Sequence, residues 1–344
     1  MTTGMKKFTK GCLYTALVIF IIGAVICGVG GLLGGFRQLD GMNIRELTGI
    51  PLVYRLSPSG IEYGFGFWDD GDIDWRGYEK WQRINDNDGE RALALTADTL
   101  RNLYIEVGAC ELHIEESEDE YVRLAVSGNT DNLRYHVEED GLRIVRKSNW
   151  TWRRVGVNRM SDKVYLYLPK ETSLDYADIE LGAGSMESIG FIARDANIEV
   201  GAGEMDIESL TADNGAILSV GAGKIRIKNL VCKATDLDIG AGEIDIDNAE
   251  VAGDVNIDLG MGNANIGGII GGDLDVTCGM GNVILDMDDA EQDHNYKIDC
   301  SMGTVKVGSR SYSGLGSEQT INNGSSSDFD IDCSMGNVTV KFAK

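Results

Sequence analysis

The second half of the chain alternates apolar and polar residues around a recurring tripeptide of the form Gly/Ser-Ala/Met-Gly. The tripeptides begin at residues 182, 201, 221, 240, 260, 279, 301 and 334, so their intervals are 19, 20, 19, 20, 19, 22 and 33 residues. A repeat of this length is typical of a solenoid, in which each unit forms one coil and buries its apolar side chains against its neighbours.

Each unit predicts one strand on either side of its tripeptide. Apolar residues occupy the positions three before and one before the tripeptide, a polar residue lies between them, and this period of two marks a half-buried strand. A second alternation follows the tripeptide, as in Ile225-Arg226-Ile227. The glycines predict a corner that needs either a positive φ or a backbone without Cβ.

Equivalent apolar residues of successive units are expected to stack into columns, because neighbouring strands lie about 4.8 Å apart. The first such column comprises Ile179, Ile198, Leu218, Leu237, Ile257, Val276, Ile298 and Ile331. The predicted fold is therefore all-β: a single-stranded β-helix or β-roll solenoid of about 19–20-residue rungs at 100–344. Within it, the Ser-, Gly- and Asn-rich stretch 309–328 predicts a loop insertion.

The N-terminus predicts one transmembrane helix that precedes the solenoid. Residues 11–36 carry no charge, and the 24 residues of 12–35 would span about 36 Å as a helix. Lys6, Lys7 and Lys10 precede this segment, so 1–10 is predicted to be a cytoplasmic tail, and the chain a single-pass cell-membrane protein with an extracytoplasmic C-terminal domain. A cleavable signal peptide has the same basic start and apolar core, and this alternative stays open.

Small residues recur every four positions within the anchor. They are Gly23, Cys27, Gly31 and Gly35. Such a stripe could pair two anchors into a homo-oligomer, although glycine is common in membrane helices for other reasons.

Residues 37–99 predict an aromatic and acidic juxtamembrane segment. Its aromatic residues include Tyr63, Phe65, Phe67, Trp68, Trp75, Tyr78 and Trp81. The aspartates around Gly71 raise the question of calcium, but their spacing departs from the EF-hand loop, and the calcium-binding nonapeptide repeat is absent. No calcium site is predicted, and whether the segment binds calcium stays open.

The chain is strongly acidic, with 55 acidic against 31 basic residues and a net charge of −24. This charge disfavours nucleic acid as a partner, because like charges repel. Outward carboxylates on successive rungs also keep a sheet-rich surface soluble and discourage edge-to-edge pairing.

The cysteines predict a buried apolar position rather than a disulfide framework. Five of the seven lie outside the apolar N-terminal segment, and an odd number cannot pair completely. Cys278, Cys300 and Cys333 take the place of the Leu, Val or Ile that immediately precedes other tripeptides. Consecutive rungs would bring Cys278 near Cys300, so the oxidation state of this pair stays open.

No motif predicts chemistry. Glu111, His113 and Glu115 alternate along one strand face and could touch a cation, but a solvated face is the favoured interpretation. The chain contains no His-Glu-x-x-His, no Gly-x-Ser-x-Gly and no Gly-x-x-x-x-Gly-Lys motif. We therefore predict no catalytic, cofactor-binding or metal-binding residues and no enzyme activity.

The layout resembles a bacterial family of β-strand-repeat proteins classed as adhesins, the domain of unknown function 4097. The resemblance covers roughly 100–344 and is carried by Leu103 to Ile114 as an opening rung with Gly108-Ala109-Cys110 at its corner, by Val164 to Pro169, by the Gly-x-Gly rungs and by Ile331 to Phe342. It implies a membrane-tethered envelope protein and supplies no catalytic residues.

Together these patterns predict a non-enzymatic cell-envelope protein whose anchored solenoid serves adhesion, scaffolding or binding of an envelope protein or cell-wall component. An accessory protein that senses envelope stress for a membrane complex is the alternative. A β-helix polysaccharide lyase or hydrolase is a more distant one, since stacked Asp238 and Asp258 could imitate its acidic cleft.

Overall fold

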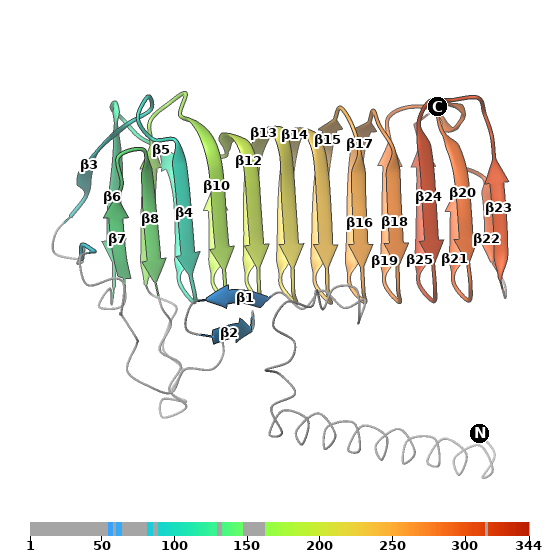
Figure 1. The fold of residues 1–344 in the computed structure, drawn as a ribbon, viewed down its shortest axis with the longest axis horizontal. Helices are drawn as coiled ribbons and strands as arrows, with labels where there is room; N and C mark the ends of the chain where they lie inside the picture. The colour runs from blue at the N-terminus through green and yellow to red at the C-terminus, as the bar shows by residue number, and fades with distance from the viewer. Residues whose placement is uncertain are drawn as a thin grey trace, which may run out of the picture. The chain divides into compact units, whose positions relative to one another are not determined.

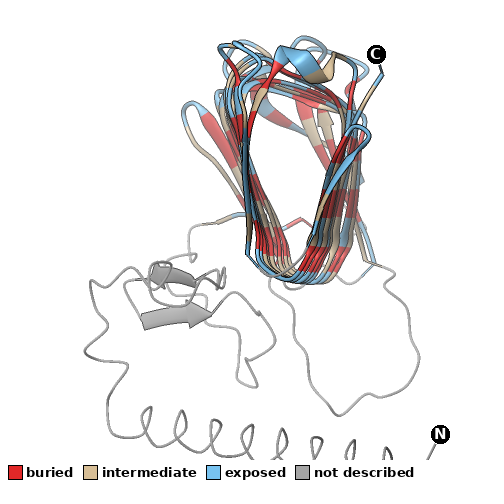
Figure 2. Cartoon of the chain, turned by 90° about the vertical axis from the view of Figure 1, so that its right-hand side faces the viewer, coloured by how far each residue is buried: buried red, intermediate tan, exposed pale blue. Residues whose placement is uncertain are grey.

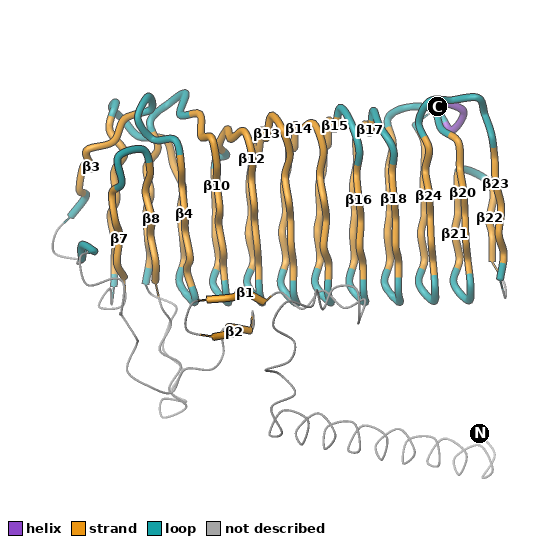
Figure 3. Tube along the Cα trace, viewed as in Figure 1, coloured by secondary structure: helices purple, strands orange, loops and turns teal. Residues whose placement is uncertain are grey.

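The computed structural model describes residues 81–84, 89–128, 133–146, 162–313 and 316–343, and also the backbone of a hairpin of β1 (Tyr54–Ser57) and β2 (Gly60–Tyr63). Strands β3 to β25 form one continuous 23-stranded sheet that winds into a solenoid (Figure 1). Strands and turns make up nearly all of the described chain (Figure 3), where the helical exception is the 3-10 turn η4 (Glu291–Asp293). The predicted all-β class is confirmed.

The predicted anchor at 11–36 lies outside the described residues. Among the residues that the structure does describe, none forms a helix with the length and apolar character needed to cross a membrane.

Each coil consists of a first strand, a tight corner and a second strand that runs back along the opposite wall of the solenoid (Figure 2). The first strands are β4 (Asn102–Val107), β8 (Gly141–Arg146), β10 (Ser173–Leu181), β12 (Phe191–Val200), β16 (Val255–Leu259), β18 (Leu274–Cys278), β20 (Asn295–Cys300) and β24 (Asp328–Cys333). The second strands are β5 (Glu111–Glu116), β9 (Lys163–Leu168), β11 (Ser185–Ser188), β15 (Glu243–Val251), β17 (Asn263–Ile270), β19 (Asn282–Met287), β21 (Thr304–Val307) and β25 (Asn337–Phe342). The long strands β13 (Glu204–Val220) and β14 (Lys224–Ile239) each run from the second strand of one coil into the first strand of the next.

The predicted apolar columns are present, and they pass through the middle of the solenoid. In the first column every residue pairs in register with the next and is at most 2% exposed. From one end to the other it comprises Ile144, Ile105, Ile179, Ile198, Leu218, Leu237, Ile257, Val276, Ile331 and Ile298. The core is therefore built from stacked coils, and each coil buries the apolar side chains of its neighbours.

The order of the coils in space departs from their order in the sequence at both ends. The β4/β5 coil lies between β8/β9 and β10/β11. At the other end, the β24/β25 coil is inserted between β18/β19 and β20/β21. The expectation that Cys278 and Cys300 are neighbours is therefore wrong, because Cys333 pairs with both of them.

Antiparallel strands cover both ends of the stack. At one end β7 (Leu133–Val137) pairs with β8, β6 (Tyr121–Ser127) pairs with β9, and β3 (Arg91–Thr96) pairs with β6. At the other end β22 (Arg310–Ser313) pairs with β21, and β23 (Ser317–Ile321) pairs with β20. The loop predicted at 309–328 thus contains two strands, which occupy edges that would otherwise be open. Strand β3 likewise joins the sheet from within the predicted juxtamembrane segment.

The corner glycines are required by close approach between coils. A Cβ on Gly262 would lie 2.0 Å from the carbonyl oxygen of Gly242 and 2.8 Å from Cγ2 of Ile239. That oxygen already accepts the backbone N–H of Asn263 at 2.9 Å. The described corner glycines have no positive φ. The sequence offered two explanations for these glycines, a positive φ or a backbone without Cβ, and the second one applies.

Candidate binding groove on the second-strand face

The outer face of the second strands carries two adjoining hollows of about 270 and 680 Å³, which share Glu115, Glu116 and Ile189. We name the combined depression the acidic groove. It is lined by His113, Ile114, Glu115, Glu116, Leu168, Pro169, Lys170, Glu171, Thr172, Glu187, Ser188, Ile189, Gly190, Phe191, Ile192, Asp206, Ile207, Glu208, Ser209, Thr211, Arg226, Lys228 and Asp247.

Strand alternation places the polar residues of the groove outward. On β5, Leu112 and Ile114 are buried in the core, whereas His113 between them faces outward. Parallel pairing aligns His113 with Glu187 of β11, and Glu187 with Asp206 of β13. Because the same register continues through successive coils, the outward side chains form a row along the solenoid.

The wall at one end of the groove is a turn that follows β9. The Thr172 hydroxyl donates a hydrogen bond of 2.7 Å to the carbonyl of Pro169 and closes this turn. Within the turn, Glu171 adopts a left-handed conformation with a φ of 65°. Across from it, Ile189 and Ile192 remain 51% and 41% exposed. Exposed apolar side chains beside carboxylates give this end of the groove a mixed character, which suits a ligand with both apolar and charged parts.

The groove has an excess of negative charge. Seven carboxylates line it against three basic side chains. Two of these cations are already paired, because Arg226 lies 2.7 Å from Asp206 and Lys228 lies 2.8 Å from Glu208. Glu115, Glu116 and Asp247 have no ion-pair partner within the described ranges. A cationic ligand would therefore meet carboxylates that the chain itself does not neutralise.

The three residues singled out on β5 are only partly brought together. Nε2 of His113 lies 2.8 Å from Glu111 Oε1, and its ring stacks on Tyr165 with 4.8 Å between the centroids. Lys163 donates to the same Glu111 oxygen at 2.7 Å, and this bond, followed by the one from His113, lowers the pKa of Glu111. Glu115 lies apart and faces the groove. Glu111 is therefore the ion-pair partner of Lys163.

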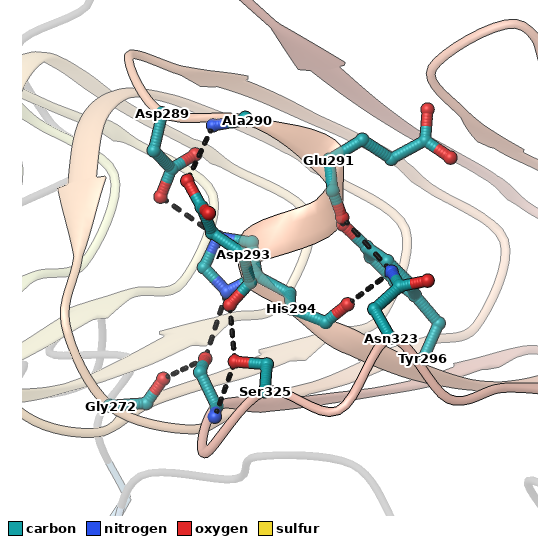
Figure 4. A network of polar contacts seen from close by, with 10 residues as sticks. Gly272, Asp289, Ala290, Glu291, Asp293, His294, Tyr296, Asn323 and Ser325 are labelled. Carbon is teal, nitrogen blue, oxygen red and sulfur yellow. Dashed lines mark hydrogen bonds and ion pairs between the residues drawn. The ribbon is translucent and has the colours of Figure 1, made fainter.

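A polar cluster that sequence reasoning missed surrounds His294 (Figure 4). Nε2 of His294 lies 2.8 Å from Asp289 Oδ2, and Nδ1 lies 2.9 Å from the Ser327 hydroxyl. The combination of Asp, His and Ser resembles a catalytic triad in composition. However, the Ser327 hydroxyl donates to the carbonyl of Gly272 at 2.6 Å, and His294 is only 2% exposed.

The cluster is therefore structural. With its one hydrogen directed at Gly272, the Ser327 hydroxyl can only accept from His294, so it is not poised as a nucleophile. The His294 ring stacks on Phe329 at 4.0 Å between centroids. Asp289 precedes β20, Ser327 precedes the inserted β24 and Gly272 precedes β18, so the cluster holds three adjacent coils together.

The five cysteines of the described ranges are free and buried. Burial raises the pKa of the Cys110 and Cys232 thiols to about 11 and, with the neighbouring thiols of Cys278 and Cys300, that of Cys333 to about 12. These thiols stay protonated at neutral pH and are poor nucleophiles.

The described strands thus form a β-solenoid whose second strands carry an acidic hollow on their outer face. The chain belongs to the Toastrack DUF4097 family, whose model matches residues 100–341. The family resemblance noted in the sequence is thereby confirmed. No curated protein matches this chain.

Several solved bacterial structures show similarity over about three quarters of the chain. A candidate adhesin from Bacteroides fragilis is 12% identical, with 73% of this chain and 95% of that chain covered and a TM-score of 0.44. A candidate lipid-binding protein from Parabacteroides distasonis is 14% identical, with 75% and 99% covered and a TM-score of 0.40. A candidate adhesin from Parabacteroides merdae is 16% identical, with 76% and 99% covered and a TM-score of 0.37.

Proposed function

We propose that this chain is a non-enzymatic binding protein of the cell envelope, in which residues 11–36 anchor the solenoid and the acidic groove captures a basic, partly apolar segment of a partner protein. The observation that carries the proposal is the surplus of unpaired carboxylates beside exposed Ile189 and Ile192. Lysine and arginine side chains of the partner would pair with these carboxylates, and its apolar side chains would cover Ile189 and Ile192.

The rigidity of the solenoid supports recognition. The groove crosses β5, β11 and β13, and backbone pairing fixes the register of these strands. A preformed surface loses little entropy on binding, so modest contacts suffice for useful affinity. This role fits adhesion or scaffolding better than catalysis, because none of the described features of the groove is a nucleophile activated by a neighbouring base.

Fluorescence anisotropy with the full-length chain tests the groove. The probe is a labelled peptide of about ten residues in which Lys or Arg alternates with Leu, and the control peptide carries Glu in place of the basic residues. We expect the basic peptide to bind, with affinity that falls as salt rises. Glu115→Gln with Glu116→Gln should weaken it at least fivefold.

The matched control is Asp258→Asn, which removes a carboxylate from β16, a first strand. It should change the affinity less than twofold. Equal binding of both peptides, or equal loss in the groove and control variants, would contradict the proposal. Release of soluble fragments from isolated cell wall would instead point to the lyase or hydrolase class.

Membrane attachment is a separate part of the proposal and has its own test. The full-length chain should stay in the membrane pellet after alkaline carbonate extraction, and a chain without residues 1–36 should not. Recovery of both in the supernatant would contradict anchoring and leave the groove unaffected.

A further inference from the structure

Four corner methionines form an exposed row on adjacent coils. In spatial order they are Met261, Met280, Met335 and Met302, which are 52–62% exposed. Backbone hydrogen bonds fix this order: the N–H of Met280 donates to Gly260, that of Met335 to Gly279 and that of Met302 to Ser334. We name this row the methionine ridge. Its order depends on the inserted coil, because consecutive stacking would place Met302 next to Met280.

Folding does not require methionine at these positions. The equivalent corner positions in earlier coils are Ala183, Ala202, Ala222 and Ala241, which make the same turn. A long apolar side chain left in water contributes little to stability, since the hydrophobic gain comes from burial. The ridge therefore presents four methionine side chains to solvent without an evident structural need.

We propose that the methionine ridge binds one soft monovalent metal ion, Cu(I) or Ag(I). Thioethers are among the ligands that select Cu(I) over harder cations. Three sulfurs around one such ion lie about 4 Å apart if each metal–sulfur bond is close to the 2.3 Å typical of zinc–sulfur bonds. Adjacent coils lie about 4.8 Å apart, which is near this value, whereas the outer two of three successive coils lie about 9.6 Å apart, so their side chains must lean toward the central one. Rotation about the first two side-chain bonds of each unbranched methionine moves its sulfur, so neighbouring sulfurs can converge.

The charge around the ridge favours a cation. Asp258, Thr277, Asp332 and Asp299 occupy one outward row two residues before the corners, and three of these four residues are carboxylates. A row of carboxylates raises the local concentration of positive ions without binding a soft ion directly. On the inner side of the corners lie the thiols of Cys278 and Cys333, which are buried in the core and at most 1% exposed. The thioethers are thus the accessible soft donors.

The two central methionines belong to either possible set of three neighbours. Met261, Met280 and Met335 form one set, and Met280, Met335 and Met302 form the other. Removal of a central sulfur breaks both sets, whereas removal of a terminal sulfur leaves one intact. This asymmetry distinguishes a metal site from general sulfur reactivity.

Titration calorimetry with silver nitrate in chloride-free buffer tests the proposal on the full-length chain. The background carries Cys12→Ser and Cys27→Ser, because these cysteines lie outside the described residues and bind silver on their own account. We expect one ion to bind, Met280→Leu and Met335→Leu each to weaken binding at least tenfold, and Met261→Leu to weaken it by no more than about twofold, because one complete set of three sulfurs remains. Leucine preserves the apolar surface and removes only the sulfur.

Circular dichroism and thiol titration of each variant verify that the fold and the buried cysteines are intact. Absence of silver binding would overturn the proposal. So would unchanged binding when all four methionines are leucine, because the ions would then be bound elsewhere. An equal loss from Met261→Leu and Met335→Leu would contradict the shared central ligands.

Discussion

Leu218→Ala tests the columns that hold the solenoid together. The Leu218 side chain is 0% exposed and lies in register between Ile198 and Leu237, which are at most 1% exposed. The substitution removes three carbon atoms at about 0.8 kcal/mol each and adds the cost of the cavity. Backbone pairing on both sides limits collapse of the neighbours, so we expect a loss of about 3–4 kcal/mol, within the range for buried leucines.

The matched control is Ile217→Ala, one residue earlier on the same strand. Ile217 is 44% exposed and faces outward, and its truncation should cost no more than about 0.5 kcal/mol. Urea unfolding of the full-length chain, followed by far-ultraviolet circular dichroism, gives both values from the midpoint and slope. If the two substitutions cost the same, or if Leu218→Ala costs less than about 1 kcal/mol, Leu218 is not part of an interior column.

Three further predictions follow from the corners, the charges and the thiols. Gly262→Ala places a Cβ 2.0 Å from the carbonyl of Gly242, so the coils must separate, and thermal unfolding should show a loss of roughly 1–3 kcal/mol. Burial and the nearby carboxylates of Asp330 and Asp258 raise the pKa of Asp275 above 3.8. A carboxyl group whose pKa is raised in the folded state destabilises that state as pH rises through the shifted range. Asp275→Asn should therefore increase stability at pH 7 by less than about 1 kcal/mol and have no effect below about pH 3, which urea midpoints at both pH values can check. Burial raises the pKa of the Cys232 and Cys333 thiols to about 11 and 12. Both should resist iodoacetamide at pH 8 in the folded chain and react once urea unfolds it, as mass spectrometry of the labelled peptides can show.

The repetitive part of the fold was predictable because its physics is local to each repeat. The alternation around Leu237 or Ile257 identifies the inward side chains, and the constant spacing aligns one repeat with the next. The opening rung at Leu103 was identified in the same way, and β4 does pair in register with β10.

The order of the terminal coils was not predictable from the same pattern. Ile298 to Gly303 and Ile331 to Gly336 both read Ile-Asp-Cys-Ser-Met-Gly, so either segment could pack against the β18/β19 coil, whose corner ends at Gly281. The strands β22 and β23 favour the observed order, because they are continuous with β21 and cover its coil from the outside.

The acidic groove was missed because its parts are distant in sequence. Glu115 and Asp247 come from different coils, and the turn at Pro169 forms a wall only after β9 has packed beside β5. Periodicity identifies outward positions, but it does not show where the outer surface is hollow. The His294 cluster was missed for the same reason, since Asp289, Ser327 and Gly272 meet only when the last coil inserts.

The insertion of the β24/β25 coil underlies both the His294 cluster and the order of the methionine ridge, and engineered disulfides test it most directly. Thr277 pairs in register with Asp332, and Asp332 pairs with Asp299, so Thr277 and Asp299 are two rungs, or about 9.6 Å, apart. Under mild oxidation Thr277→Cys with Asp332→Cys should form a disulfide, which mass spectrometry detects as a linked peptide. Thr277→Cys with Asp299→Cys should not, because a disulfide does not bridge Cα atoms more than about 7 Å apart. The reverse outcome would show that the coils stack in the order of the sequence and would contradict the inserted arrangement.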